Sequence, residues 1–255
     1  MPSEPAMSEK EILRDILNVA TKARDNADQL FIEAKLLRSA GALSRALFLH
    51  QISLEECAKV DMLGAWAVSQ LADLVPDNKK FSKALASHRA KNYANAYMLE
   101  PTEAEKQARE AGDWKTAIET FEKRKVEFHQ ESNAAKNAAL YVDAQGGEPS
   151  EHTTEAMVEE ISGRNVEFLA HANNHVLVLS RWQDSAAEFA EVVRWFVERA
   201  EELRDAQRVD PSQAMDTLLA EALEKLPVNR KWRTQVPASH AQPEADGAVD
   251  GKDDA

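Results

Sequence analysis

Residues 44–59, SRALFLHQISLEECAK, decide how the rest of the chain is interpreted. The pattern predicts a helix that is apolar on nearly every side, and such helices are usually buried. Yet the stretch also carries five charged or titratable side chains: Arg45, His50, Glu55, Glu56 and Lys59. Buried charges are costly unless they are paired. The stretch therefore predicts either a structural ion-pair network or a polar site inside a helical core.

The composition around this stretch is that of an all-α protein. Among 255 residues there are only eight glycines and nine prolines, and β-branched runs are scarce. The formal net charge of −13 disfavours a broad nucleic-acid-binding face, so we expect no DNA partner, although it leaves room for a local basic pocket. Cys57 is the only cysteine, which excludes a disulfide framework and a cysteine-based zinc site.

No targeting segment is predicted. The N-terminal sequence MPSEPAMSEKE is polar and acidic, unlike a signal peptide. No run approaches the roughly 18 apolar residues that a membrane span needs. We therefore expect a cytoplasmic protein with no membrane partner.

Helical periodicity extends over most of the chain. Ser8 and Glu11 have the spacing of a capping box and predict the start of a first helix that reaches Arg38. Further helices are predicted over residues 42–74, 78–99, 103–110, 114–141, 153–181, 184–208 and 211–226. We expect a disordered tail over 1–8, one helical domain over 9–208, a C-terminal helix with a basic patch over 209–235, and a disordered acidic tail over 236–255.

The charges of the central helix separate into two groups. At about 100° per residue, Arg45 and Glu56 share a stripe that Glu55 and Lys59 flank, so these four side chains can satisfy one another. His50 lies about 140° away from Arg45 and needs a partner from another helix or another subunit.

The predicted helix over 78–99 has a polar face where a core face should be apolar. His88, Asn92 and Asn95 lie on it, with Lys91 at its edge. A single inward-facing histidine is most often structural, but one that faces a pair of carboxylates is a candidate for proton transfer. His88 is therefore a candidate acid or base, provided that Glu55 and Glu56 face it.

Arg45 and His50 are spaced R-x4-H. Such a pair can cleave RNA without a metal ion, because the histidine moves a proton and the arginine holds the scissile phosphate. The spacing alone favours the ordinary alternative of a surface arginine and a core histidine, since helical proteins offer such pairs by chance. On one straight helix the two side chains diverge, so a joint site needs a second helix or subunit.

Metal and cofactor motifs are missing from the sequence. Carboxylate-bridged metal centres in helical bundles need Glu-x-x-His pairs on two helices, and none is present. Glu167 and His171, four residues apart, would suit a single pair of metal ligands but not that motif. Gly-rich phosphate loops and nucleophile elbows are also absent. We expect no metal and no cofactor.

Three stretches together resemble a known family: SRALFLHQISLEECAK (44–59), FSKALASHRAK (81–91) and KNAALYVD (136–143). They are similar to the AbiV-type abortive-infection proteins of bacteria, and the likeness covers about residues 27–181. That family is grouped with the HEPN-like helical proteins. The resemblance implies an up-and-down helical bundle, here with additional C-terminal helices, that is usually dimeric. Many HEPN-like proteins are RNases with an R-x4-6-H motif at the dimer interface.

The resemblance also implies roles for individual residues. Arg45 and His50 correspond to the RNase pair, and a second set corresponds to the family's own signature: Glu55, Glu56, Lys59, His88 and Lys91. On this basis Arg45, His50 and His88 are the expected catalytic residues. Glu55, Glu56, Lys59 and Lys91 form the expected supporting polar network.

The resemblance implies phage defence by arrest of the infected cell, through a metal-independent endoribonuclease or through inhibition of translation. The expected partners are a second copy of the chain, a phage-encoded activator or host protein, and RNA. The alternative is a non-catalytic helical protein that acts by binding a phage or host protein. The acidic composition and Ala46, which follows Arg45 where a polar residue is common, favour that alternative.

Overall fold

The computed structural model describes residues 7–74, 77–142, 146–202, 217 and 221. Within these ranges the regular structure is helical, which confirms the predicted all-α fold. The predicted helix over 211–226, the basic patch and the acidic tail lie outside the described residues, except for Thr217 and Glu221. In chain order the elements are α1 (Glu9–Ser39), α2 (Leu43–Leu71), α3 (Asn78–Ala86), α4 (His88–Asn95), η1 (Ala96–Met98), α5 (Glu103–Glu110), α6 (Trp114–Ala138), η2 (Pro149–His152), α7 (Glu155–Asp184) and α8 (Ala186–Glu202).

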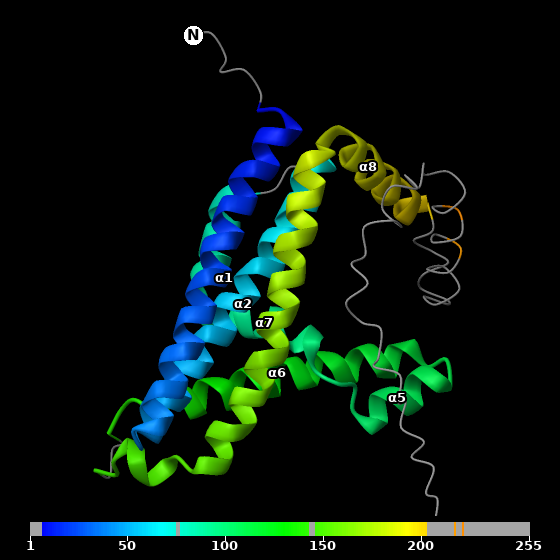
Figure 1. The fold of residues 1–255 in the computed structure, drawn as a ribbon. Helices are drawn as coiled ribbons and strands as arrows, with labels where there is room; N and C mark the ends of the chain where they lie inside the picture. Colours follow the sequence, from blue (N-terminus) through cyan, green and yellow to red (C-terminus); the bar gives the residue numbers. More distant parts are fainter. Residues whose placement is uncertain (1–6, 75–76, 143–145, 203–216, 218–220, 222–255) are drawn as a thin grey trace, which may run out of the picture.

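Three long helices, α1, α2 and α7, form the central bundle (Figure 1). Helices α1 and α2 are antiparallel, and the Ser53 hydroxyl donates to the Ala27 carbonyl oxygen between them, at 2.7 Å. Helix α7 also runs antiparallel to α1, so that Arg38 near the end of α1 pairs with Glu155 at the start of α7, at 2.6 Å. Helix α7 is therefore parallel to α2, and the chain between them must cross over.

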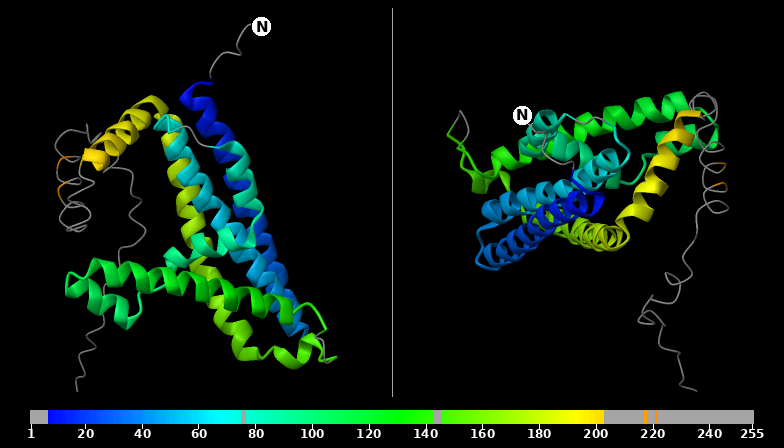
Figure 2. Two further views of the ribbon diagram at one scale, coloured as in Figure 1. Left: turned by 180° about the vertical axis from the view of Figure 1, so that it is seen from behind. Right: turned by 90° about the horizontal axis from the view of Figure 1, so that it is seen from above.

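The crossover comprises α3 to α6. Helix α4 packs against both α2 and α6, and α6 runs across the bundle rather than along it (Figure 2). Helix α5 folds back on α6, where the buried Glu105 pairs with Arg109 and lies 3.7 Å from Arg124. The crossover thus brings α4 and α6 against one side of the central helix α2.

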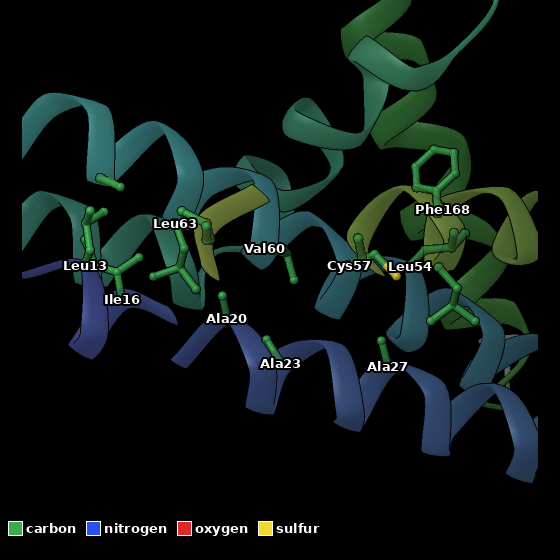
Figure 3. Close-up of a cluster of buried hydrophobic side chains, with 14 of the residues drawn as sticks. Leu13, Ile16, Ala20, Ala23, Ala27, Leu54, Cys57, Val60, Leu63 and Phe168 are labelled. Carbon is green, nitrogen blue, oxygen red and sulfur yellow. The ribbon is translucent and has the colours of Figure 1, made fainter. Parts of the chain in front are cut away.

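The core of the bundle depends on small residues in α1. Ala20, Ala23 and Ala27 are buried and face the side chains of Val60 and Leu63 on α2 (Figure 3). Because alanine projects little, the two helix axes can approach closely. Burial of each large apolar side chain then contributes about 1.5–3 kcal/mol.

The helix starts agree well with the sequence pattern. The capping box is present, since the Glu11 amide donates to Ser8 Oγ at 3.4 Å and Glu11 Oε2 accepts from the Ser8 amide at 2.9 Å.

The prediction of one helix over 78–99 is wrong. The chain breaks at Ser87 (ψ 119°), whose hydroxyl caps α4 by accepting from the Ala90 amide. A serine can cap a new helix in this way even without a glycine or proline nearby.

Helix α8 folds back at the far end of the bundle. Trp182 and Phe189 stack with ring centroids 3.8 Å apart, and Arg194 pairs with Glu9 at 3.1 Å. The N-terminal turn of α1 is thereby tied to α8. None of the helices in the described ranges combines the length and apolar character that a membrane span requires.

Candidate functional site

Glu55 is the centre of a buried ionic cluster. Its side chain is 3 % exposed, and three cationic or titratable groups surround it. Lys91 Nζ lies 2.8 Å and His88 Nδ1 2.5 Å from Oε2, while Lys136 Nζ donates to Oε1 at 3.1 Å. We refer to Glu55, His88, Lys91 and Lys136 as the Glu55 network. It joins α2 to α4 and α6.

The polar face of α4 is what docks that helix on α2. His88, Lys91 and Asn92 have the spacing of one helical face, and Asn95 continues it one turn later. The Asn95 side chain donates to the Leu54 carbonyl oxygen at 2.9 Å. The face predicted to be polar therefore turns inward, because α2 offers it a carboxylate and a carbonyl group.

The charges of the network do not cancel. Burial alone would raise the pKa of Glu55, but hydrogen bonds from Lys91 and His88 and the charges of Lys91 and Lys136 outweigh burial and lower it below its usual value. Glu55 is therefore an anion. Two buried ammonium groups face this single carboxylate, so the network has one net positive charge before His88 is counted.

His88 is the solvent-exposed member of the Glu55 network. It is the first residue of α4 and its side chain is 54 % exposed. Glu55 holds the Nδ1 atom, while Nε2 has no hydrogen-bond partner within the described ranges. A carboxylate that fixes one ring nitrogen and leaves the other toward solvent orients an imidazole for proton transfer.

A second set of contacts extends the cluster along α6. The Asn92 amide nitrogen lies 3.2 Å from His129 Nδ1, and the His129 ring meets Tyr93 edge-on at 5.9 Å. Burial, reinforced by Arg89 and Lys136, lowers the pKa of His129. Lys125 and Arg89 lie over the Tyr93 ring at 5.3 and 5.8 Å. Cationic side chains thus continue from the network to the surface.

Glu56 and Lys59 form a separate pair. Their charged atoms are 2.5 Å apart, and the Lys59 side chain is 29 % exposed. The sequence spacing also allowed an ion pair between Glu55 and Lys59, but Glu55 pairs with side chains of other helices. Glu56 and Lys59 therefore lie beside the Glu55 network and contribute no ion pair to it.

Arg45 does not reach the network. Its side chain is exposed, and it makes no ion pair within the part of the chain that the structure describes. It lies ten residues before Glu55 on α2, about 15 Å along the helix axis. Within one chain, Arg45 is available to solvent but not to His88.

His50 is fully buried between α2 and α7. Asn165 donates to both Nδ1 and the backbone oxygen of His50, each at 3.2 Å, and Asn165 also lies 3.0 Å from the Ser53 hydroxyl. Since Nδ1 accepts, the ring proton lies on Nε2. Burial, with smaller contributions from Arg38 and Lys35, lowers the pKa of His50 to about 4. His50 is thus neutral and closed to solvent.

Arg45 and His50, whose spacing matches an RNase pair, therefore do not come together within one chain. Arg45 is exposed and His50 is 0 % exposed, and their side chains make no contact in the described ranges. The structure instead brings together Glu55, His88 and Lys91, which the family resemblance had placed in one signature set.

Three participants were missed by the sequence pattern. They are Lys136 and His129 of α6 and Asn165 of α7, none of which was a candidate site residue. Each follows the helical period of its own element, but its partner is distant in sequence, 81 residues away for Lys136 and 115 for Asn165. The partner considered for His171, Glu167, is also not the one observed, because His171 lies beside Asp61.

An open groove of about 170 Å³ lies between α2, α6 and α7. Gln51 and Ser132 line it, one helical turn before Glu55 and Lys136 respectively, together with Arg164. The four residues of the Glu55 network do not line this groove.

Comparisons with known proteins agree with this fold. The family model for AbiV proteins, HEPN_AbiV, matches residues 15–170. A curated relative, the uncharacterised protein y4gJ of Sinorhizobium fredii (strain NBRC 101917 / NGR234), is 43% identical over 113 residues. The aligned part is 43% of this chain and 59% of that protein, so the chain spans less than two thirds of the relative's length. No solved structure gives a significant match.

Proposed function

Because the chain belongs to the AbiV family of HEPN proteins, we propose that it is a phage-defence protein that cleaves RNA, with His88 as the proton-transfer group. Family membership supports the role in abortive infection. The contact between the half-exposed His88 and the buried Glu55, at 2.5 Å, carries the proposal of RNA cleavage. The proposed step needs no metal ion: His88 takes the proton of the 2′-hydroxyl as that oxygen attacks the phosphorus, the bond from phosphorus to the 5′-oxygen breaks, and the 5′-oxygen takes a proton from water.

The charge of the network suits a phosphodiester. Lys91 and Lys136 exceed the single negative charge of Glu55, so the site attracts an anion next to His88. Arg89, which makes no ion pair in the described ranges, continues this positive region toward the surface, whereas Lys125 is paired with Glu122 at 2.6 Å. RNA is thus the favoured substrate despite the overall net charge of −13.

Arg45 is proposed to act from a second copy of the chain. It is too far along α2 to join His88 of its own chain, yet it is exposed and free of ion pairs in the described ranges. Ile32 and Leu36, at the end of α1 that connects to α2, are 45% and 64% exposed. Exposed apolar side chains at the end of the bundle where α2 begins support a homodimer interface there, and light scattering that shows only monomer at micromolar concentration would contradict it.

His50 is proposed to hold α2 against α7 and to take no part in proton transfer. A neutral imidazole whose Nδ1 is occupied by Asn165 cannot meet an RNA hydroxyl without the bundle opening. The family signature residues Glu55 and Lys91 then position His88, while Glu56 and Lys59 stabilise the adjacent surface of α2.

The test replaces His88 by glutamine in bacteria that express the full chain and are infected with phage. Glutamine can still donate to Glu55 but cannot titrate. We expect H88Q to lose RNA cleavage and phage protection while its melting temperature stays near that of the wild type. H152Q, which removes an exposed histidine of η2, is the matched control and should behave as wild type.

Two further variants separate the remaining roles. Arg45→Ala should weaken protection without lowering stability, because the side chain is exposed. His50→Ala should lower stability first, and any loss of protection should follow from it. If H88Q cleaves RNA as wild type does, the assignment of His88 is wrong.

A second function is favoured by how thoroughly the network is enclosed. Lys91 and Lys136 are 6% and 7% exposed, and with Glu55 they join three helices. Such a cluster can simply fix helix positions, in which case the protein would act by binding a phage or host protein. Full phage protection by H88Q, with intact cellular RNA in both wild type and variant, would support this function over RNA cleavage.

A further inference from the structure

A different cluster lies where α2 and α7 run side by side, on side chains that the proposed reaction does not use. Asp61 of α2 faces two histidines of α7 that are one helical turn apart, His171 and His175. Asp61 Oδ1 lies 2.6 Å from His175 Nδ1 and 3.4 Å from His171 Nε2. The three ligand atoms all lie within 4.8 Å of one another. The two imidazole rings are 4.1 Å apart between centroids.

The Asp61 oxygen has charged neighbours but no aligned hydrogen-bond donor. Oδ1 is buried, and its 2.6 Å contact with His175 is an ion pair that is not aligned as a hydrogen bond in the described ranges. A buried carboxylate oxygen without an aligned donor is costly. Two ring nitrogens converge on it instead, as ligands converge on a cation.

We propose that Asp61, His171 and His175 bind a divalent transition-metal ion of the zinc class. Zinc lies about 2.0–2.2 Å from nitrogen and oxygen ligands, so two ligands of one ion lie roughly 3–4 Å apart. The spacing from Asp61 Oδ1 to His171 falls in that range and the spacing to His175, 2.6 Å, lies below it, so a small rotation of His175 away from Asp61 would make room for one ion between the three atoms. Imidazole ligands favour zinc over magnesium or calcium, which prefer oxygen.

The site has three protein ligands and an open side. The three side chains are 21–38% exposed, so a water molecule can complete a tetrahedral coordination. The ion would join α2 to α7 directly. His171 and His175 follow the last residue of the family match, residue 170, so the site does not follow from that match.

The competing explanation is a plain ion pair between Asp61 and His175. An ion pair needs no second histidine and binds no metal. Zinc titration of the full chain, without a histidine tag and after treatment with a chelator, distinguishes the two. We expect calorimetry to give one bound zinc ion per chain. We also expect the melting temperature to rise by about 5–10 °C at a zinc concentration a hundredfold above Kd.

The variants are His171→Gln, His175→Gln and Asp61→Asn, each of which should abolish the zinc-dependent rise. Glu167→Gln is the matched control, because Glu167 is exposed and lies one turn before His171 on the same helix. It should bind zinc as wild type does. H88Q, which removes a histidine outside the cluster, should also retain binding.

Cobalt gives a readout that does not depend on whether the variants fold. Co²⁺ added to the wild-type chain should produce the visible absorption of a tetrahedral ion, and Zn²⁺ should displace it. Absence of that absorption, or zinc binding that survives His175→Gln with unchanged stoichiometry, would overturn the proposal. Since none of these measurements requires RNA cleavage, their outcome is independent of the role of His88.

Discussion

His50 and His88 lie in opposite kinds of environment at helix α2: His50 belongs to α2 and faces α7, whereas His88 belongs to α4 and contacts Glu55 of α2. His50 is buried, neutral and held by the Asn165 amide, whereas His88 is half-exposed and held by the Glu55 carboxylate. Burial lowers the pKa of His50 to about 4 and excludes solvent, whereas the His88 ring is open to solvent and held by a carboxylate. A histidine therefore becomes a candidate for chemistry through its partner and its exposure, and motif spacing alone does not select it.

The largest expected effect on stability comes from removing the charge of Glu55, with which both Lys91 and Lys136 pair. Glu55→Gln leaves Lys91 and Lys136 buried without a counter-charge, which should lower the free energy of unfolding by about 3–5 kcal/mol. The melting temperature should then fall by about 6–20 °C, as measured by calorimetry. Glu56→Gln is the control, because its partner Lys59 is partly exposed and the loss should stay below about 1 kcal/mol. Equal effects of the two variants would contradict the central place of Glu55.

The next largest effect is the dependence of the free energy of unfolding on pH that His50 causes. The folded chain keeps this imidazole neutral down to a pKa of about 4, from an ordinary value of 6.5. Between these pH values the unfolded chain binds the extra proton, so stability falls as the pH falls. Over that window the wild type should lose at most about 3 kcal/mol more than His50→Leu, measured by urea unfolding.

A smaller loss is expected when the amide partner of His50 is removed. Asn165→Ala deprives Nδ1 and a backbone oxygen of their donor, at a cost of about 1–3 kcal/mol in the free energy of unfolding. Asn174→Ala, on an exposed position of α7, provides the control and should change stability much less. If both variants unfold alike in urea, the amide does not stabilise His50.

The smallest expected effect on stability is that of His88→Gln. The ring is half-exposed and Glu55 keeps both lysines, so the free energy of unfolding should change by less than about 1 kcal/mol. Together with loss of RNA cleavage, this result would make His88 the functional counterpart of the structural His50. A loss of stability as large as that of Glu55→Gln would instead assign His88 to the framework.

Much of the fold was predictable because its signals are local. The capping box at Ser8 and Glu11, and the helix over residues 103–110, depend on neighbouring residues only. The break at Ser87 was missed, since ALASHRA contains no helix breaker and the serine cap is one of several options for that sequence.

The candidate site was less predictable because its contacts are not local. Helix geometry predicted that His50 and Arg45 point in different directions. It could not predict the partner of His50, Asn165, because that residue belongs to α7. The carboxylate expected to pair with Lys59 pairs with Lys91 and Lys136, which the crossover supplies. Helical periodicity tells which side chains share a face, but not which face of another helix meets them.

The crossover between the parallel helices α2 and α7 has a mechanical consequence. Glu55 belongs to the three-helix bundle, whereas His88, Lys91 and Lys136 all belong to the crossover. Any displacement of α4 and α6 away from α2 must pull unlike charges apart in a medium of low polarity, and the restoring force of such a separation is steep. The Glu55 network thus acts as a latch between the two parts of the molecule.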